Sequence, residues 1–148
     1  MTPPQDIIDA AKQAQKKWGI PASISIAQWA LESAWGKHMP PDSNNPFGIK
    51  ARTGEPSVTV PTREFLNGKS ITIQAPFRKF ASIAEAFDRH GELLATAPVY
   101  AKARSFENSP DQFADALTGT YATDPKYGSL LHAIMHGANL YQYDTAPA

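Results

Sequence analysis

The sequence predicts an α+β domain that is mainly helical and carries one small β hairpin about two-fifths of the way along the chain. Apolar residues recur at helical spacing before and after the middle of the chain, whereas residues 58–74 show the alternation and turn residues of paired strands. The 148 residues suffice for one hydrophobic core and are too few for two. We therefore predict a single domain over residues 1–148, with its core between about residues 4 and 141.

The first helix is expected over residues 4–18, where apolar side chains recur every three or four positions. Thr2 and Gln5 have the spacing of a capping box, and Gly19 is placed to end the helix. The pattern predicts an amphipathic helix that packs one face on the core.

The second helix is expected to run from Pro21, which suits a helix start, to Gly36, which suits a C-terminal cap. Its expected buried stripe consists of Ile24, Ala27, Leu31 and Ala34. Residues 37–55 are rich in Pro, Asn, Asp, Ser and Gly, and therefore predict a long structured loop.

A β hairpin is expected from residues 58–66 and 69–74, joined at Asn67 and Gly68. An Asn-Gly pair favours the tight turn in which both central residues have positive φ. Pro61 has no backbone N–H to donate, so its strand is expected to lie at a sheet edge.

Three more helices are expected after the hairpin. The first covers residues 83–97, behind a capping box that starts at Ser82. A short one covers residues 110–118. The last covers residues 125–141, with Asp124 placed to cap it.

Glu32 is the candidate catalytic acid, because it is the only charged residue from Ile20 to Gly36. Helical spacing places Trp29 one turn before it and Trp35 one turn after it. Indole rings desolvate a carboxyl group and also stack on sugars, and a helix C-terminus disfavours negative charge. We therefore expect a raised pKa for Glu32. The alternative is an ordinary surface glutamate, with Trp29 packed in the core.

The composition excludes several classes of function. Fourteen Lys and Arg residues balance fourteen Asp and Glu residues, so no net field attracts nucleic acid or an acidic membrane. Without cysteine there is no disulfide, thiolate metal site or Cys nucleophile. His132 and His136 lie one turn apart, as in metal-binding helices, but lack the Glu of a zinc-peptidase motif. We interpret them as a solvated face and expect no metal and no cofactor.

Four ordered segments resemble the N-acetylglucosaminidase domain of glycoside hydrolase family 73, which is found in flagellar rod hydrolases and autolysins. These segments are Ala27–Gly36, Asn45–Lys50, Phe77–Phe80 and Tyr121–Tyr127. The resemblance implies a lysozyme-like α+β fold. It also implies hydrolysis of the β-1,4 bond that follows N-acetylglucosamine in peptidoglycan, the expected partner of the chain.

The resemblance also assigns roles to single residues. Glu32 matches the general acid of the family, and Glu64 resembles the glutamate of the β lobe that some members use as a second carboxylate. Other members use another residue there, or the acetamido group of the substrate. Tyr121 matches a tyrosine near the reacting sugar. The other substrate-binding residues expected are Trp35, Asn45, Phe47 and Tyr127, of which Asn45 and Phe47 chiefly shape the cleft floor.

Two alternatives stay open at this point. A lytic transglycosylase shares a lysozyme-like fold and a single helical glutamate, but cleaves after N-acetylmuramic acid without water. A non-catalytic peptidoglycan-binding module would keep the cleft and lack turnover.

The start of the sequence has neither the basic segment nor the apolar stretch of a signal peptide or membrane span. Action in the periplasm or cell wall would then require a secretion system or a lysis route. We expect a monomeric endolysin or secreted effector; an effector would have a periplasmic immunity protein that plugs the cleft at Glu32.

Overall fold

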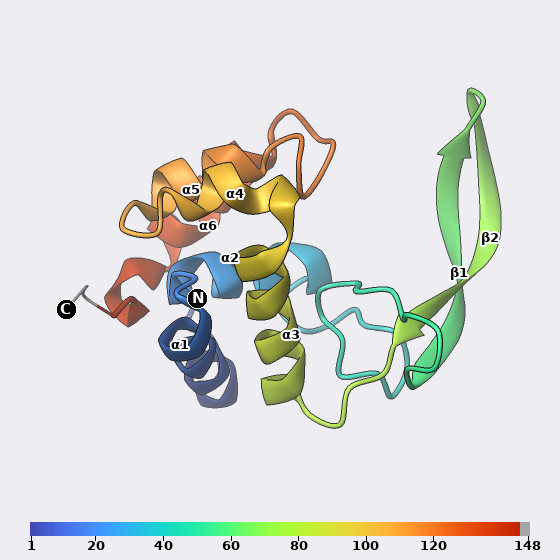
Figure 1. Cartoon of the computed structure of the whole chain (residues 1–148), viewed down its shortest axis with the longest axis horizontal. Coiled ribbons are helices and arrows are strands. Elements are labelled where there is room, and N and C mark those ends of the chain that lie inside the picture. Colours follow the sequence, from blue (N-terminus) through green and yellow to red (C-terminus); the bar gives the residue numbers. More distant parts are fainter. Residues whose placement is uncertain (146–148) are drawn as a thin grey trace.

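The computed structural model describes residues 1–145 and, for residues 64–66, the backbone alone. A β hairpin projects from a body of helices (Figure 1). The elements are α1 (Gln5–Trp18), α2 (Ala22–Ser33), β1 (Ser57–Leu66), β2 (Lys69–Arg78), α3 (Ile83–Thr96), η1 (Pro98–Tyr100), α4 (Ala101–Arg104), α5 (Pro110–Leu117), α6 (Tyr127–Gly137) and η2 (Leu140–Tyr143). This arrangement confirms the predicted α+β class, and the short helix α4 is an element that the sequence pattern did not predict.

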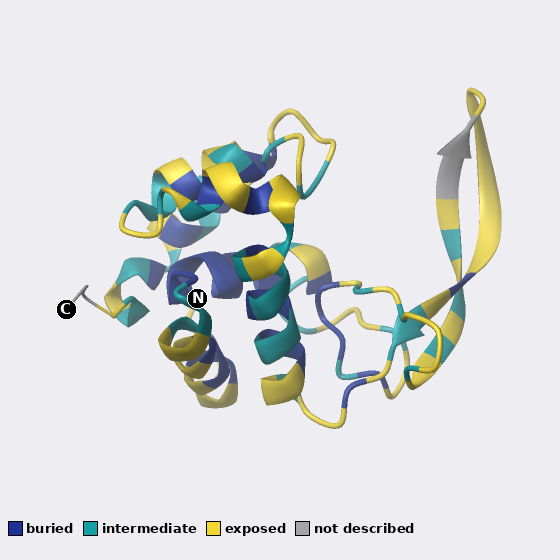
Figure 2. Cartoon of the chain, viewed as in Figure 1, coloured by how far each residue is buried: buried dark blue, intermediate teal, exposed yellow. Residues whose placement is uncertain are grey.

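Helix α2 is the centre of the helical body. All of its residues except Leu31 and Glu32 are buried (Figure 2). Helices α1, α3, α5 and α6 and the η2 turn all pack against it, as expected for a helix that is apolar on every side. Glu32 therefore lies where the most buried helix of the fold reaches solvent.

The N-terminus of α2 receives its hydrogen bonds from distant parts of the chain. Pro21 precedes the helix and provides no side-chain cap. The Ala22 N–H donates to Gln15 Oε1 at 3.1 Å. The Ser23 N–H and Oγ–H donate to the two carboxylate oxygens of Asp144, each at 2.7 Å. Residues of α1 and of the last described segment thus satisfy donors that the helix itself leaves free.

The C-terminus of α2 differs from the prediction, because the helix ends at Ser33 rather than at Gly36. Ala34, Trp35 and Gly36 follow in the left-handed region, with φ of 50°, 61° and 86°. The Ser33 hydroxyl donates to the Trp29 carbonyl oxygen at 2.5 Å and accepts the Gly36 N–H at 2.8 Å. This side chain stabilises a tight left-handed turn directly after Glu32.

The hairpin has the predicted turn, with φ of 51° at Asn67 and 76° at Gly68. Both strands are edges, because the sheet has two strands. The register pairs Val60 with Ala75 and Thr62 with Ile73.

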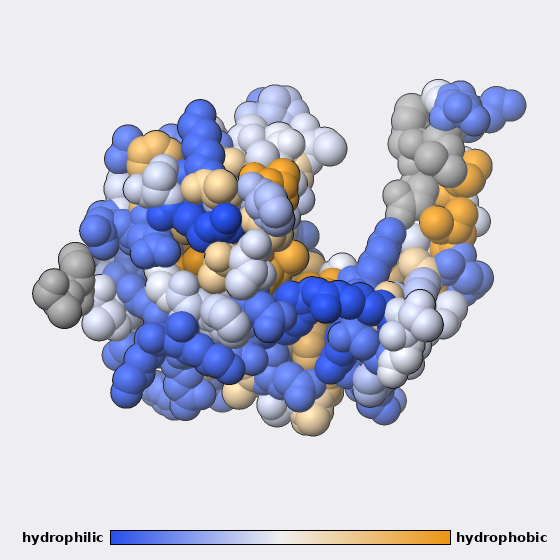
Figure 3. Space-filling view, viewed as in Figure 1, coloured by the Kyte–Doolittle hydropathy of each residue, from blue (hydrophilic) through white to orange (hydrophobic). Residues whose placement is uncertain are grey.

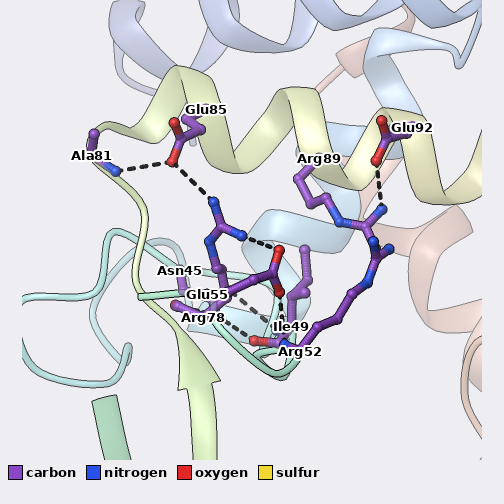
Figure 4. Close-up of polar contacts among 9 residues, drawn as sticks. All are labelled: Asn45, Ile49, Arg52, Glu55, Arg78, Ala81, Glu85, Arg89 and Glu92. Atoms are coloured by element: carbon purple, nitrogen blue, oxygen red, sulfur yellow. Dashed lines mark hydrogen bonds and ion pairs between the residues drawn. The ribbon is translucent and has the colours of Figure 1, made fainter. Parts of the chain in front are cut away.

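The base of the hairpin is attached to helix α3 through charged side chains (Figure 4). Arg78, at the end of β2, forms an ion pair with Glu55 of the preceding loop and lies 3.9 Å from a carboxylate oxygen of Glu85. Glu85 also accepts the Ala81 N–H at 3.1 Å. These contacts fix the direction in which the hairpin leaves the helical body.

Asn45 gives the predicted loop its structure. Its amide nitrogen donates to the carbonyl oxygens of Ile49 (2.8 Å) and Arg78 (3.0 Å), and its amide oxygen accepts the Ile49 N–H at 3.1 Å. One buried side chain therefore closes the loop on itself and joins it to β2 (Figure 4).

Two of the expected helix starts are wrong. Pro4 is the N-cap of α1, without a side-chain hydrogen bond, so Thr2 and Gln5 form no capping box. Helix α6 begins at Tyr127, and the Asp124 carboxylate instead accepts the Lys126 N–H at 2.8 Å in the turn before it. The box at Ser82 is confirmed in its first half, since Ser82 Oγ accepts the Glu85 N–H at 3.1 Å.

The two histidines of α6 contact acidic residues of α5 rather than solvent alone. His132 Nε2 lies 3.1 Å from an Asp115 carboxylate oxygen, and His136 Nε2 lies 3.4 Å from one of Asp111. Within the described residues, no group of three or more His, Asp or Glu side chains is arranged to hold a metal ion. The pairs therefore connect α5 to α6.

Candidate active site

A cleft of about 430 Å³ lies between the C-terminal end of α2 and the hairpin. The space-filling view shows the surface hollowed between the helical body and the hairpin (Figure 3). Residues of three elements line the cleft, among them Glu32, Lys37, His38, Asn45, Val60, Thr62 and Phe77. Glu32 is the only carboxylate among the described residues that line it.

Glu32 is open to the cleft on one side and backed by buried helices on the other. Desolvation raises the pKa of its carboxyl group above the ordinary value, and a hydrogen bond from Tyr127 opposes part of that rise. The Tyr127 hydroxyl donates to Glu32 Oε1 at 3.0 Å. A carboxyl group with a raised pKa beside a cleft is suited to donate a proton to a bound ligand.

A buried hydrogen-bond chain continues from Tyr127 away from the cleft. The Gln28 amide nitrogen donates to the Tyr127 hydroxyl oxygen at 3.0 Å. The Gln28 amide oxygen lies 2.8 Å from His90 Nε2. Gln28 and His90 have no exposed surface, so three helices contribute side chains to one continuous network behind Glu32.

Aromatic rings enclose this network. Phe47 stacks on the His90 imidazole with centroids 4.1 Å apart and planes at 16°. Tyr121 stacks on Tyr127 at 5.9 Å and 19°, and burial raises the pKa of both phenols. Phe47 is 5% exposed and Tyr127 is 3% exposed, so both lie beneath the cleft surface. The burial of Phe47 is compatible with its expected place in the cleft floor, and the expected contact of Tyr127 with substrate stays a prediction.

The tryptophans near Glu32 have different environments. Trp29 is 2% exposed and belongs to the core, which agrees with the packing alternative for this residue. Trp35 is half-buried and meets the Trp29 ring edge-on, with centroids 5.6 Å apart. Of the two indoles, Trp35 is therefore the one with surface available to a ligand.

The remaining predicted site residues fall into two groups. Asn45 lines the cleft, and its amide is engaged by the loop and β2; its expected role in the cleft floor stays a prediction. Glu64 lies in β1 opposite Ile71, and its side chain is outside the described residues. The assignment of Glu64 as second carboxylate stays a prediction.

Sequence reasoning missed the roles of Gln28 and His90. Gln28 stands one turn before Glu32 in an otherwise apolar helix, and His90 stands in the apolar stripe of α3. A polar residue in each of two buried stripes was the available signal, since buried polar groups need partners.

The chain matches known glucosaminidases over most of its length. Residues 8–140 match the family model described as mannosyl-glycoprotein endo-β-N-acetylglucosaminidase. An autolysin of Enterococcus faecalis is 39% identical over 133 residues, which cover 84% of this chain and 18% of that protein. A probable N-acetylmuramidase of Lactococcus lactis is 38% identical over 150 aligned positions, which cover 96% of this chain and 34% of that protein. The chain thus spans about a third or less of the length of these two relatives.

Solved structures agree with this match. The catalytic domain of the autolysin Auto from Listeria monocytogenes superimposes with a TM-score of 0.82 at 33% identity, covering 94% of this chain and 84% of that domain. The similarity includes both the helical body and the hairpin lobe, which confirms the lysozyme-like fold. The chain therefore belongs to the glucosaminidase family of glycoside hydrolases, family 73.

Proposed function

We propose that this chain hydrolyses the β-1,4 bond after N-acetylglucosamine in peptidoglycan, with Glu32 as the general acid. The observation that carries this proposal is the position of Glu32: a desolvated carboxyl group with a raised pKa, on the wall of the cleft between the helical body and the hairpin. Family membership supports the reaction class, and the names of the relatives support the cell wall as the substrate.

In the proposed reaction, Glu32 donates its proton to the glycosidic oxygen as the bond to the sugar breaks. Negative charge then develops on the carboxylate, and the hydrogen bond from Tyr127 becomes charge-assisted and stronger. The hydrogen bond from Tyr127 therefore stabilises the transition state more than the ground state, and this difference accelerates the reaction.

Glu64 is proposed as the second carboxylate. Val60, Pro61 and Thr62 of β1 line the cleft, and position 64 lies two residues further along the same strand. The distance between the two carboxyl groups in the bound state would decide between inversion and retention at the sugar carbon.

Trp35 and Tyr121 are proposed to contact the sugar rings. Both residues are half-buried; Trp35 follows Glu32 by three positions, and Tyr121 is stacked on Tyr127, the hydrogen-bond partner of Glu32. Asn45, Phe47 and Tyr127 are proposed to maintain the cleft from below.

The test is digestion of purified peptidoglycan by the wild type and by Glu32→Gln, with Glu107→Gln as a matched control on an exposed site outside the cleft. We expect Glu32→Gln to lose about 10²- to 10⁴-fold in rate, as for the loss of a general acid, with unchanged folding. Near-normal clearing by this variant would refute the proposed role of Glu32.

Mass spectrometry of the released muropeptides tests the cleaved bond. Reducing N-acetylglucosamine ends support the proposal. Reducing N-acetylmuramic acid ends would support a muramidase, the activity in the name of the Lactococcus relative. Anhydro-muramoyl ends would instead identify a lytic transglycosylase.

The site of action is proposed to be the periplasm or the cell wall, where the substrate lies. No helix in the described part of the chain is long and apolar enough to cross a bilayer. A monomeric state and an immunity protein that covers the cleft stay predictions. Light scattering of the purified chain tests the first, and co-purification from the periplasm of a producing cell tests the second.

A further inference from the structure

The hydrogen-bond chain from His90 to Glu32 has a direction. Four side chains take part: His90 from α3, Gln28 and Glu32 from α2, and Tyr127 from α6. Each link joins one donor to one acceptor, and the Gln28 amide offers its oxygen on one side and its nitrogen on the other. The position of one hydrogen on His90 therefore determines the position of every other hydrogen in the chain.

The free nitrogen of His90 determines this direction. His90 Nδ1 is buried and has no hydrogen-bond partner among the described residues. A buried N–H without a partner is rarer and costlier than an unpaired acceptor, so the neutral ring carries its hydrogen on Nε2. Phe47 and Tyr121 flank the ring without contributing a charge, and burial lowers the pKa of His90 to about 3.

The remaining hydrogens follow in order. His90 Nε2–H donates to the Gln28 amide oxygen, which turns the Gln28 amide nitrogen towards Tyr127. The Tyr127 oxygen accepts that N–H, so its own hydrogen points to Glu32 Oε1. Glu32 Oε1 thus already accepts a hydrogen bond, whatever ligand occupies the cleft.

We propose that His90, Gln28 and Tyr127 are positioning residues that keep Glu32 Oε1 as an acceptor, so that the proton delivered to the substrate is carried on Oε2. This inference rests on the proposed role of Glu32 as general acid. With the opposite His90 tautomer, Gln28 would turn over and Tyr127 would donate to it. Glu32 would then have to place its proton on Oε1, in a bond to Tyr127, and withhold it from the cleft.

Other titratable groups near Glu32 do not take part in this chain. Lys37 and His38 line the same cleft, and the Tyr121 ring is stacked on Tyr127. They remain unchanged in the variants below, so their contribution to the pH dependence is common to all of them.

The first experiment reads the tautomer directly. The ¹⁵N NMR signals of the His90 ring, assigned through their correlation with the backbone signals of the same residue, should show a protonated Nε2 and an unprotonated Nδ1 in the wild type. A proton on Nδ1 would overturn the proposal. This measurement uses the wild-type chain, so it decides the matter even if a variant fails to fold.

The second experiment measures kcat and KM against pH for Tyr127→Phe and His90→Phe. Tyr127→Phe removes the donor to Glu32, so the alkaline limb of its kcat–pH profile should move up by about one pH unit. We expect kcat to fall about 10- to 100-fold and KM to change less than about threefold. His90→Phe allows the Gln28 side-chain amide to rotate by 180°, and should also move the alkaline limb to higher pH. His90→Gln retains an N–H donor and should keep the wild-type limb.

The controls distinguish a positioning role of the hydrogen-bond chain from a purely structural role. They also distinguish a failure of this proposal from a failure of Glu32 as the general acid. Ser23→Ala removes a buried hydrogen bond at the other end of α2 and should lower stability without moving the limb. The double variant of His90→Phe and Tyr127→Phe should match Tyr127→Phe alone. A limb unmoved by His90→Phe, with activity still dependent on Glu32, would refute the hydrogen-bond chain alone. Activity that survives Glu32→Gln would refute the general acid instead.

Discussion

His90 should make the stability of the fold fall as the pH is lowered from 7 to 5. Burial lowers the pKa of this imidazole from 6.5 to about 3. Between these pH values, the unfolded chain binds a proton at His90 that the folded chain does not bind. His90 therefore costs no stability at pH values above 6.5, its pKa in the unfolded chain. The free energy of unfolding decreases progressively as the pH falls from there towards about 3, its pKa in the folded chain.

The magnitude follows from the difference between these two pKa values. Well below pH 6.5, the free energy of unfolding should decrease by about 1.4 kcal/mol for each pH unit because of His90 alone. The loss from pH 7 to pH 5 is then about 2 kcal/mol. That amount is a substantial fraction of the 5–15 kcal/mol that stabilises an ordinary domain, about 10–40% of it.

Urea unfolding at several pH values, followed by tryptophan fluorescence, measures this dependence. The variants His90→Phe and His90→Gln carry no titrating group at this position, so the contribution of His90 should disappear from both. The other ionisable groups of the chain are the same in every variant, so the difference from the wild type isolates His90. Equal slopes in the wild type and both variants would show that the imidazole is protonated in the fold, contrary to the reasoning.

Two substitutions test the packing and the backbone around the site. Gly128→Ala should cost about 1–3 kcal/mol in urea unfolding, because its Cβ would lie 2.9 Å from side-chain oxygens of Asp115 and Thr118 and 3.1 Å from backbone. Gly137→Ala, with open space in the same helix, should cost nothing; equal losses would contradict the packing argument. Ala34→Gly should raise the melting temperature, since it relieves a φ of 50° worth about 0.5–1 kcal/mol. Ala133→Gly, an exposed position inside α6, should lower the melting temperature by a similar amount, and a fall in both variants would exclude strain at Ala34.

Local sequence signals predicted the elements whose causes are local. The Asn67-Gly68 pair determines its turn by backbone conformation alone, and the turn forms as expected. Gly19 likewise ends α1 with a φ of 82°. Helix α2 could not be delimited in this way, because the Ser33 hydroxyl and the turn at Ala34 end it before the glycine that the pattern favours.

The candidate site could be predicted only in part. Glu32 could be identified because it is the only charged residue from Ile20 to Gly36, which can be seen in the local sequence alone. The network behind it joins Gln28 to His90, 62 positions later, and to Tyr127, 99 positions later. Helical periodicity indicates which residues face the core, but does not indicate which of them meet there.

The carboxylate of Asp144 at the start of α2 has a consequence for the order in which the chain matures. During synthesis, the N–H and hydroxyl groups of Ser23 lack their carboxylate acceptor until residue 144 has left the ribosome and reached the start of this helix. The helix that carries Glu32 is therefore among the last elements to be fully stabilised. A partly synthesised chain would hold the Glu32 carboxyl group on a helix whose N-terminal hydrogen bonds are incomplete.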